Sequence, residues 1–204
     1  MTVDFDLGPA AGRMAGLLEA VPADRLTAPT PCEDYRLGDL IEHIGGLALA
    51  FTAAAAKSGL PPGGPEGPSG DASRLDEDWR TLFPARLAAL ADAWRDPAAW
   101  EGVTRAGGVE LPGDVAARVA LNELVVHGWD VARSSGQPYD CGERELLACL
   151  EFVSQFAPGP GREPAPEGLF AAAVDVPADA PLIDRVVGLT GRDPSWRGNH
   201  PSRP

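Results

Sequence analysis

The chain has 204 residues, of which 44% are hydrophobic, and this is enough for one domain with a single core. Asp and Glu total 30 against 17 Lys and Arg, so the net charge is -13, and such a chain repels nucleic-acid phosphates and anionic lipids. Nucleic acid and membranes are therefore not expected as partners. No uninterrupted apolar stretch reaches the roughly 18 to 20 residues that span a bilayer, and residues 1–12 lack a signal pattern, so we expect a cytoplasmic protein.

The N-terminal part of the chain predicts two helices joined by a loop. Apolar residues recur at helical spacing over residues 5–21, and Pro22 ends the pattern. Prolines then punctuate residues 27–35, because each proline pushes the residue before it out of the helical region. A second helix is predicted over residues 37–57, where apolar side chains share one face and His43 lies about a quarter-turn from its centre. His43 is thus expected at the rim of the buried face.

The next segments predict a loop, a helix and an irregular connection. Residues 58–71 are rich in proline and glycine and hold few packing residues, which is typical of a surface loop. Leucines, tryptophans and a phenylalanine predict a third helix over residues 73–95, with Pro84 either kinking it or starting a new helix. Residues 100–112 mix glycines with β-branched residues, which fits a short strand pair or an extended arm.

Residues 113–133 predict the central helix of the fold, because their apolar side chains cover nearly every direction around the helix axis. A fifth helix is predicted over residues 143–156. After a second break rich in proline and glycine, residues 170–176 fit an extended chain and residues 181–189 fit a short terminal helix. These elements predict a mainly α protein.

Glu123 and His127 lie four residues apart in the central helix, so both side chains leave the same face about one turn apart. A carboxylate among the apolar residues around Glu123 needs a strong partner, and either a metal or an arginine would serve. His43 is the candidate third ligand, from a helix expected to pack beside the central one. Two imidazoles and one carboxylate are typical of open, catalytic divalent-metal sites. The alternative is that each histidine is a hydrogen-bonded core residue.

The sequence supports a role in the metal site less strongly for three other polar residues. Asp39 and Asp130 are spaced to accept a hydrogen bond from His43 and His127 respectively. For Asp39 we favour the alternative of an acidic residue placed to suit the helix dipole, whereas Asp130 is either an orienting acceptor or a surface charge. His200 lies in the proline-rich tail and is a weak ligand candidate.

Cysteine chemistry and nucleotide binding are not indicated by the sequence. Cys32, Cys141 and Cys149 are too few and too irregularly spaced for a disulfide framework or a cysteine-based zinc site. Cys32 could be a nucleophile, but no basic residue beside it would activate it, so a packing role is favoured. The glycine-rich segment lacks the lysine and the flanking elements of a phosphate-binding loop.

Three segments carry a resemblance to a known family: TPCEDYRLGDLIEHIGG, LNELVVHGWDVARSSGQ and LTGRDPSW. They resemble the mycothiol-dependent maleylpyruvate isomerase-like metal-binding family, which belongs to the DinB-like four-helix superfamily. The middle segment is the most specific, because it joins the Glu-x-x-x-His pair to His-Gly-Trp-Asp in one helix.

The resemblance implies a DinB-like four-helix bundle in an up-down-down-up arrangement, with a short extra helix and minor β elements. It implies a metal-binding helical domain over residues 1–191 and a C-terminal tail over residues 192–204. The family's metal triad falls on His43, Glu123 and His127, and zinc is its usual metal. Enzymes of the family use the metal to activate a low-molecular-weight thiol, which adds to or is transferred onto an electrophile.

One departure from the family limits the expected reaction. The isomerase proper has a further C-terminal domain that contributes an arginine for its dicarboxylate substrate, and we expect this chain to lack that domain. Maleylpyruvate isomerisation itself is therefore not expected. Arg133 or Arg192 could serve an anionic substrate, or either could be a surface salt-bridge residue.

These observations predict a metal-dependent thiol S-transferase or isomerase, with a mycothiol-like thiol and an electrophilic small molecule as its partners. The alternative is a metal-binding protein without turnover, such as a sensor or an accessory protein. A third hypothesis, a bundle whose triad has only a structural role, is disfavoured because all three ligands are present. A homodimer is compatible with the superfamily, in which pairing is common.

Overall fold

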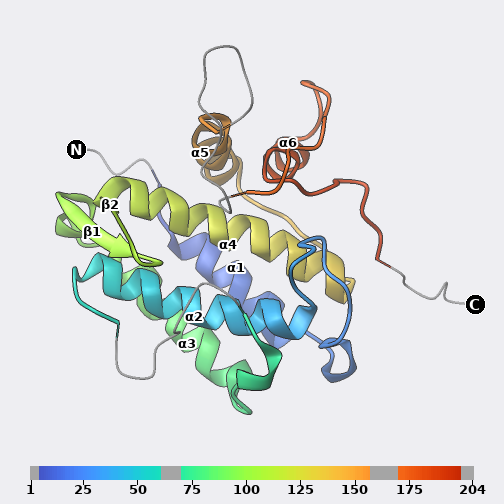
Figure 1. Cartoon of the computed structure of the whole chain (residues 1–204), viewed down its shortest axis with the longest axis horizontal. Coiled ribbons are helices and arrows are strands. Elements are labelled where there is room, and N and C mark those ends of the chain that lie inside the picture. The colour runs from blue at the N-terminus through green and yellow to red at the C-terminus, as the bar shows by residue number, and fades with distance from the viewer. Residues whose placement is uncertain (1–4, 61–69, 157–169, 199–204) are drawn as a thin grey trace, which may run out of the picture.

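In the computed structural model, residues 5–60, 70–156 and 170–198 are described. Four helices pack side by side as a bundle (Figure 1), and they are α1 (Gly8–Glu19), α2 (Leu37–Ala55), α3 (Trp79–Ala93) and α4 (Gly113–Ser135). The prediction of a mainly α, DinB-like four-helix bundle is confirmed. His200, the ligand candidate in the tail, lies outside the described residues.

Two further α-helices, a hairpin and three 3-10 turns, at Ala23–Arg25, Ala72–Arg74 and Pro97–Trp100, complete the described structure. Helices α5 (Glu143–Ser154) and α6 (Leu182–Leu189) lie together on the side of α4 that faces away from α2 and α3 (Figure 1). Strands β1 (Val103–Ala106) and β2 (Val109–Pro112) pair antiparallel, so that Thr104 faces Leu111. Of the two interpretations of residues 100–112, the strand pair is therefore correct.

Helix α4 lies at the centre of the molecule, as its sequence predicts. It packs against α1 and α2 on one side and against α5 on the other, and most of its residues are buried. Trp129 and Val125 are among the largest fully buried side chains of the protein. Polar side chains on this helix are consequently held in fixed surroundings, which is what a binding site requires.

Helix α2 supplies the opposite wall of the site. Its length and composition would allow it to cross a membrane, but more than half of it is buried in the bundle, as is typical of a core helix. Leu40, Ile41 and Ile44 are almost completely buried. Next to these residues, His43 is only partly buried, which agrees with its predicted place at the rim of the apolar face.

Several predicted boundaries differ from the observed ones. The helix predicted from residue 73 begins only at Trp79, because residues 72–74 form a separate 3-10 turn and Leu75 is extended. Pro84 lies within α3, which continues through it to Ala93. Residues 170–176 form no strand in the described structure, although the N–H of Val174 donates to the carbonyl of Gly188 at 2.9 Å.

Candidate metal centre

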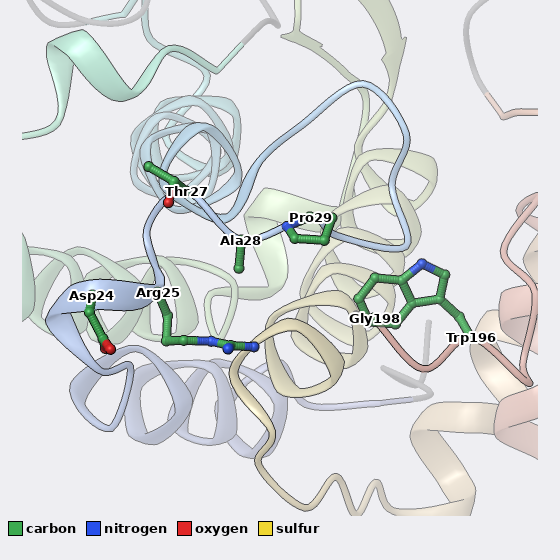
Figure 2. A pocket seen from close by; sticks show the side chains of 7 residues that line it. All are labelled: Asp24, Arg25, Thr27, Ala28, Pro29, Trp196 and Gly198. Atoms are coloured by element: carbon green, nitrogen blue, oxygen red, sulfur yellow. The ribbon is translucent and has the colours of Figure 1, made fainter. Parts of the chain in front are cut away.

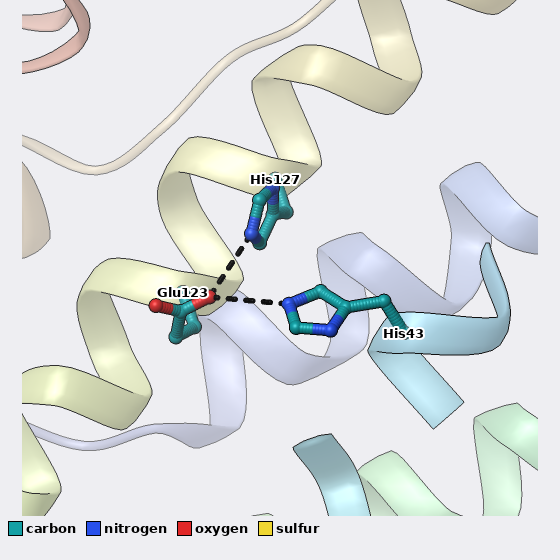
Figure 3. Close-up of side chains that lie close together, drawn as sticks. All are labelled: His43, Glu123 and His127. Atoms are coloured by element: carbon teal, nitrogen blue, oxygen red, sulfur yellow. Dashed lines mark ion pairs between the residues drawn. The ribbon is translucent and has the colours of Figure 1, made fainter. Parts of the chain in front are cut away.

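Glu123 stands between two imidazoles, one on its own helix and one on the neighbouring helix (Figure 3). Its Oε2 atom lies 3.0 Å from Nε2 of His127 and 3.8 Å from Nε2 of His43. One ligand atom from each of the three residues lies within 4.8 Å of the other two. The rings of His43 and His127 meet edge to face, with centroids 5.2 Å apart. The three residues predicted to form a site are thus brought together by the packing of α2 on α4.

The three side chains are shielded from water to different degrees. Only 11% of the His43 side chain and 8% of the His127 side chain is exposed, against 24% for Glu123. The imidazoles are therefore fixed by packing, while about a quarter of the Glu123 side chain remains exposed.

His127 has a carboxylate on each side of its ring. Its Nδ1 atom lies 3.0 Å from Oδ2 of Asp130, and its Nε2 atom lies 3.0 Å from Oε2 of Glu123. An ionised carboxylate can only accept hydrogen bonds, so a neutral imidazole can satisfy one of these contacts but not both. A positive charge, either a second proton on the ring or a metal ion, would satisfy the contact between His127 and Glu123 as well.

The pKa values of this pair follow from the same contacts. Burial opposes a charged imidazole, but hydrogen bonds and charges from Asp130 and Glu123 outweigh it and raise the pKa of His127 to about 9. Burial likewise opposes a charged Glu123, and the two histidines outweigh it, so the pKa of this carboxyl is held well below its usual value. The cluster favours an anionic Glu123 with positive charge beside it.

Tyr35 and Gly70 form a wall beside His43. The Tyr35 ring lies against the His43 ring, with centroids 5.1 Å apart, and its hydroxyl oxygen accepts a hydrogen bond from the Gly70 N–H at 3.4 Å. A Cβ at Gly70 would stand 2.1 Å from the carbonyl oxygen of Asp39 and 2.9 Å from the Cβ of His43. Only glycine allows the chain to pass this close to α2.

The segment after Gly70 is held to α2 by carboxylates. Oδ1 of Asp39 accepts a hydrogen bond from the N–H of Ala72 at 2.8 Å, and Oε2 of Glu42 accepts one from the N–H of Asp71 at 3.0 Å. The other oxygen of Asp39 accepts from the N–H of Arg36, at the start of α2. Asp39 is therefore an acidic residue of the first helical turn, the alternative that the sequence favours.

Comparison with known proteins places the chain in a family. Residues 7–132 match the family described as mycothiol maleylpyruvate isomerase N-terminal domain. The chain belongs to this family. The predicted resemblance is thereby confirmed, and the matched residues include His43, Glu123 and His127.

Further comparisons find sequence relatives and solved structures of the same fold. Two uncharacterized proteins of Mycobacterium tuberculosis, from strains CDC 1551 and H37Rv, are each 30% identical over 185 residues, which is 87% of this chain and 91% of the relative. The structures of the mycothiol-dependent maleylpyruvate isomerase and of a mutant of it match with TM-scores of 0.54 and 0.55. Both are 17% identical to the chain and cover 74% of it and 67% of their own length, and at this identity they show a shared fold.

The triad of this mycothiol maleylpyruvate isomerase family member fits a divalent cation in chemistry and in size. Imidazole nitrogen and carboxylate oxygen are common zinc ligands, with bonds of about 2.0 to 2.2 Å. Tetrahedral bonds of that length place two ligand atoms about 3.3 Å apart, and the observed separations of 3.0 and 3.8 Å lie on either side of this value. The donor set leaves room for a further ligand.

The two arginines considered for substrate binding have other partners than the three clustered side chains. Arg133 is half buried inside α4, and its guanidinium stacks over the Trp129 ring at 5.2 Å. Arg192 is 9% exposed and lies 3.1 Å from Oδ2 of Asp130. Neither is a surface salt-bridge residue. The division of the chain at residue 191 stays a prediction, but Arg192, directly after it, packs against the central helix.

Tyr35 and Gly70 are site residues that the sequence did not single out. A tyrosine in a proline-rich connection and a glycine in a glycine-rich loop carry no signal of their own, because their roles come from contacts with a distant helix. The only available signal was the position of Tyr35 within the TPCEDY segment of the family resemblance.

None of the cysteines is activated. Burial raises the pKa of Cys32 to about 11 and that of Cys141 to about 12, and it also raises that of Cys149. A nucleophilic cysteine needs a lowered pKa. The chain thus offers no thiolate of its own at neutral pH.

A separate hollow of about 210 Å³ lies away from the triad, between the connection after α1 and the C-terminal segment (Figure 2). It is lined by Asp24, Arg25, Thr27, Ala28, Pro29, Trp196 and Gly198. Arg25 extends toward the end of α4, where it donates to the carbonyl of Ser134 at 2.8 Å. Its lining includes none of the three clustered side chains.

Proposed function

We propose that this protein binds one divalent metal ion, most simply zinc, through His43, Glu123 and His127, and uses it to activate a low-molecular-weight thiol of the mycothiol type. The activated thiol would be transferred to an electrophilic small molecule or would catalyse its isomerisation. The observation that carries the proposal is that Oε2 of Glu123 faces the Nε2 atoms of two histidines from different helices. A divalent cation shared by the three side chains would satisfy all of these contacts.

Each residue has a defined task in this proposal. When bound, a divalent metal supplies Lewis acidity, which lowers the pKa of a coordinating thiol. His43 and His127 hold the ion from opposite helices, and Glu123 adds the negative charge that neutral imidazoles lack. Asp130 would accept a hydrogen bond from the Nδ1–H of His127 and so direct the Nε2 lone pair toward the ion.

The thiol must come from outside the chain. All three cysteines have raised pKa values, whereas S-transfer requires a thiolate. Family membership supports mycothiol as the thiol class, because the solved enzyme of the same fold is a mycothiol-dependent isomerase. Such a role would place the protein in the cytoplasm, where small thiols are kept reduced.

Metal binding and turnover can be tested separately. Protein purified without added metal is analysed for its metal content and then titrated with zinc, in parallel with His127→Ala. We expect about one equivalent for the wild type and a large loss of affinity in the variant. A wild type that holds less than about a tenth of an equivalent of metal and takes up no zinc on titration would contradict the metal site.

For turnover, zinc-loaded protein is mixed with mycothiol and a panel of electrophiles, and thiol consumption or isomer conversion is followed. His127→Ala is the matched control. A rate above that control supports an enzyme. Tight metal binding with no thiol binding and no excess rate would favour the alternative, a sensor or accessory protein.

A further inference from the structure

Arg192 reaches the central helix from the C-terminal segment, and its guanidinium makes two hydrogen bonds, one to that helix and one within its own segment. Its Nη2 atom donates to Oδ2 of Asp130 at 3.1 Å, and its Nη1 atom donates to the carbonyl oxygen of Thr190 at 2.8 Å. The Asp130 side chain is completely buried, and only 10% of the Arg192 side chain is exposed. The guanidinium therefore balances a carboxylate that water cannot reach.

Arg192 and the candidate metal ligand His127 share one oxygen atom. Oδ2 of Asp130 lies 3.1 Å from Nη2 of Arg192 and 3.0 Å from Nδ1 of His127. Its other oxygen, Oδ1, has no hydrogen-bond partner among the described residues. The direction of the carboxylate is thus set by these two donors alone. Arg192 therefore holds Oδ2 of Asp130 in place, and this oxygen orients the imidazole of His127.

The backbone before Arg192 is shaped to deliver this side chain. Helix α6 ends at Leu189, and the N–H of Arg192 donates back to the carbonyl of Val187 at 2.9 Å. Between them Gly191 adopts φ of 85°, in the left-handed region that glycine adopts without strain. Arg192 lies outside residues 7–132, the part of the chain that matches the family.

We propose that Arg192 is a positioning residue of the metal centre: it holds Asp130 so that the carboxylate orients His127 with Nε2 toward Glu123. The inference rests on the proposed metal site and extends it to the C-terminal segment. Through Arg192, α6 and the turn after it become part of the site.

A role in positioning differs from a role in folding. If Arg192 only fastened the C-terminal segment, its loss would lower the melting temperature and leave the affinity for metal unchanged. If it positions His127, metal affinity falls because part of the binding free energy must then orient the ring. When a residue that orients a metal ligand without binding the metal is mutated, metal affinity falls by roughly 10-fold to 100-fold.

The test measures zinc affinity by competition with a chelating dye for the wild type, Arg192→Met, Asp130→Asn and the double variant. The matched control is Arg197→Met, because Arg197 is exposed on the same segment and, among the described residues, its hydrogen bonds go to the nearby carbonyls of Ser195 and Trp196. We expect roughly a 10-fold loss for Arg192→Met and no change for Arg197→Met. In the Asp130→Asn background, the Arg192 substitution should have no further effect.

Equal zinc affinity for the wild type and Arg192→Met overturns the proposal, even when the variant melts at a lower temperature. The proposal is also overturned if Arg192→Met lowers zinc affinity as much in the Asp130→Asn background as in the wild type. Arg192 would then act on the metal site by a route that does not involve Asp130.

Should Arg192→Met not fold, Arg192→Lys replaces it. One ammonium cannot match the forked contacts to Thr190 and Asp130, so a loss is still expected, and unchanged affinity counts against the proposal. A wild type that binds no zinc contradicts the proposed function instead.

Discussion

Nε2 of His43 in α2 lies 3.8 Å from Oε2 of Glu123 in α4. The two residues are far apart in the sequence, and they meet because the two helices pack side by side in the bundle. A metal ion between them would join the helices directly. Occupancy of the site and stability of the bundle should therefore depend on each other.

Metal removal should lower the melting temperature. A ligand present at 100 times its dissociation constant stabilises the folded state by about 2.7 kcal/mol, which for a chain of this size raises the melting temperature by roughly 5 to 10 °C. Scanning calorimetry with zinc and with excess chelator measures the difference. His43→Ala should show no such shift, and a shift that persists in this variant would place the metal elsewhere.

In chelator-treated protein, stability should depend on pH in a defined direction. The pKa of His127 is about 9 in the folded protein against an ordinary value of 6.5, so its contribution is complete below pH 6.5 and is lost as the pH rises through 9. The pKa of Glu123 is lowered, so its contribution is present above the ordinary value of 4.5 and is lost as the pH falls.

The cluster should therefore stabilise metal-free protein most between about pH 4.5 and 6.5. Melting temperatures measured with chelator should fall by roughly 6 to 11 °C between pH 6.5 and 9.5, and the fall should be much smaller in His127→Gln. Saturating zinc should also reduce it, because the metal binds the deprotonated imidazole. An equal alkaline fall in the wild type and in His127→Gln would contradict the pKa of about 9.

Gly70→Ala should damage the wall beside His43. The new Cβ would stand 2.1 Å from the Asp39 carbonyl oxygen, which belongs to the α2 backbone and cannot rotate away. We expect a loss of about 1 to 3 kcal/mol in the free energy of unfolding, measured by urea denaturation, together with weaker zinc binding. Gly59→Ala is the matched control, since a Cβ there meets nothing within 4 Å. Equal stability of both variants would show that the chain passes α2 less closely.

Cys32 should react slowly with alkylating agents. Burial raises its pKa to about 11, and the nearby Arg192 offsets only part of this, so about 0.1% of the thiol is ionised at pH 8. Timed iodoacetamide treatment followed by peptide mass spectrometry should show labelling far slower than in urea-unfolded protein, with a roughly 10-fold rise per pH unit. If Cys32 were labelled as fast in the folded protein as in the unfolded chain, its pKa would not be raised and a nucleophilic role would be supported.

The helical bundle follows from local features of the sequence. Apolar periodicity predicted all the main helices, because the side chains that pack into the core must recur with the period of the helix. The glutamate and histidine of α4 could be paired from sequence alone, since i and i+4 residues are neighbours on any helix. The predicted start of α3 was less accurate, because residues 72–74 form a 3-10 turn and the helix begins only at Trp79.

Tertiary packing decided what lies around that pair. Spacing within one helix cannot show which residue of another helix faces it, so His43 joined the triad only as a candidate until α2 was seen beside α4. Tyr35, Gly70 and Arg192 contact the site from segments with no periodic pattern. Their contacts depend on where the chain returns in space, and that is set by the packing of the whole bundle.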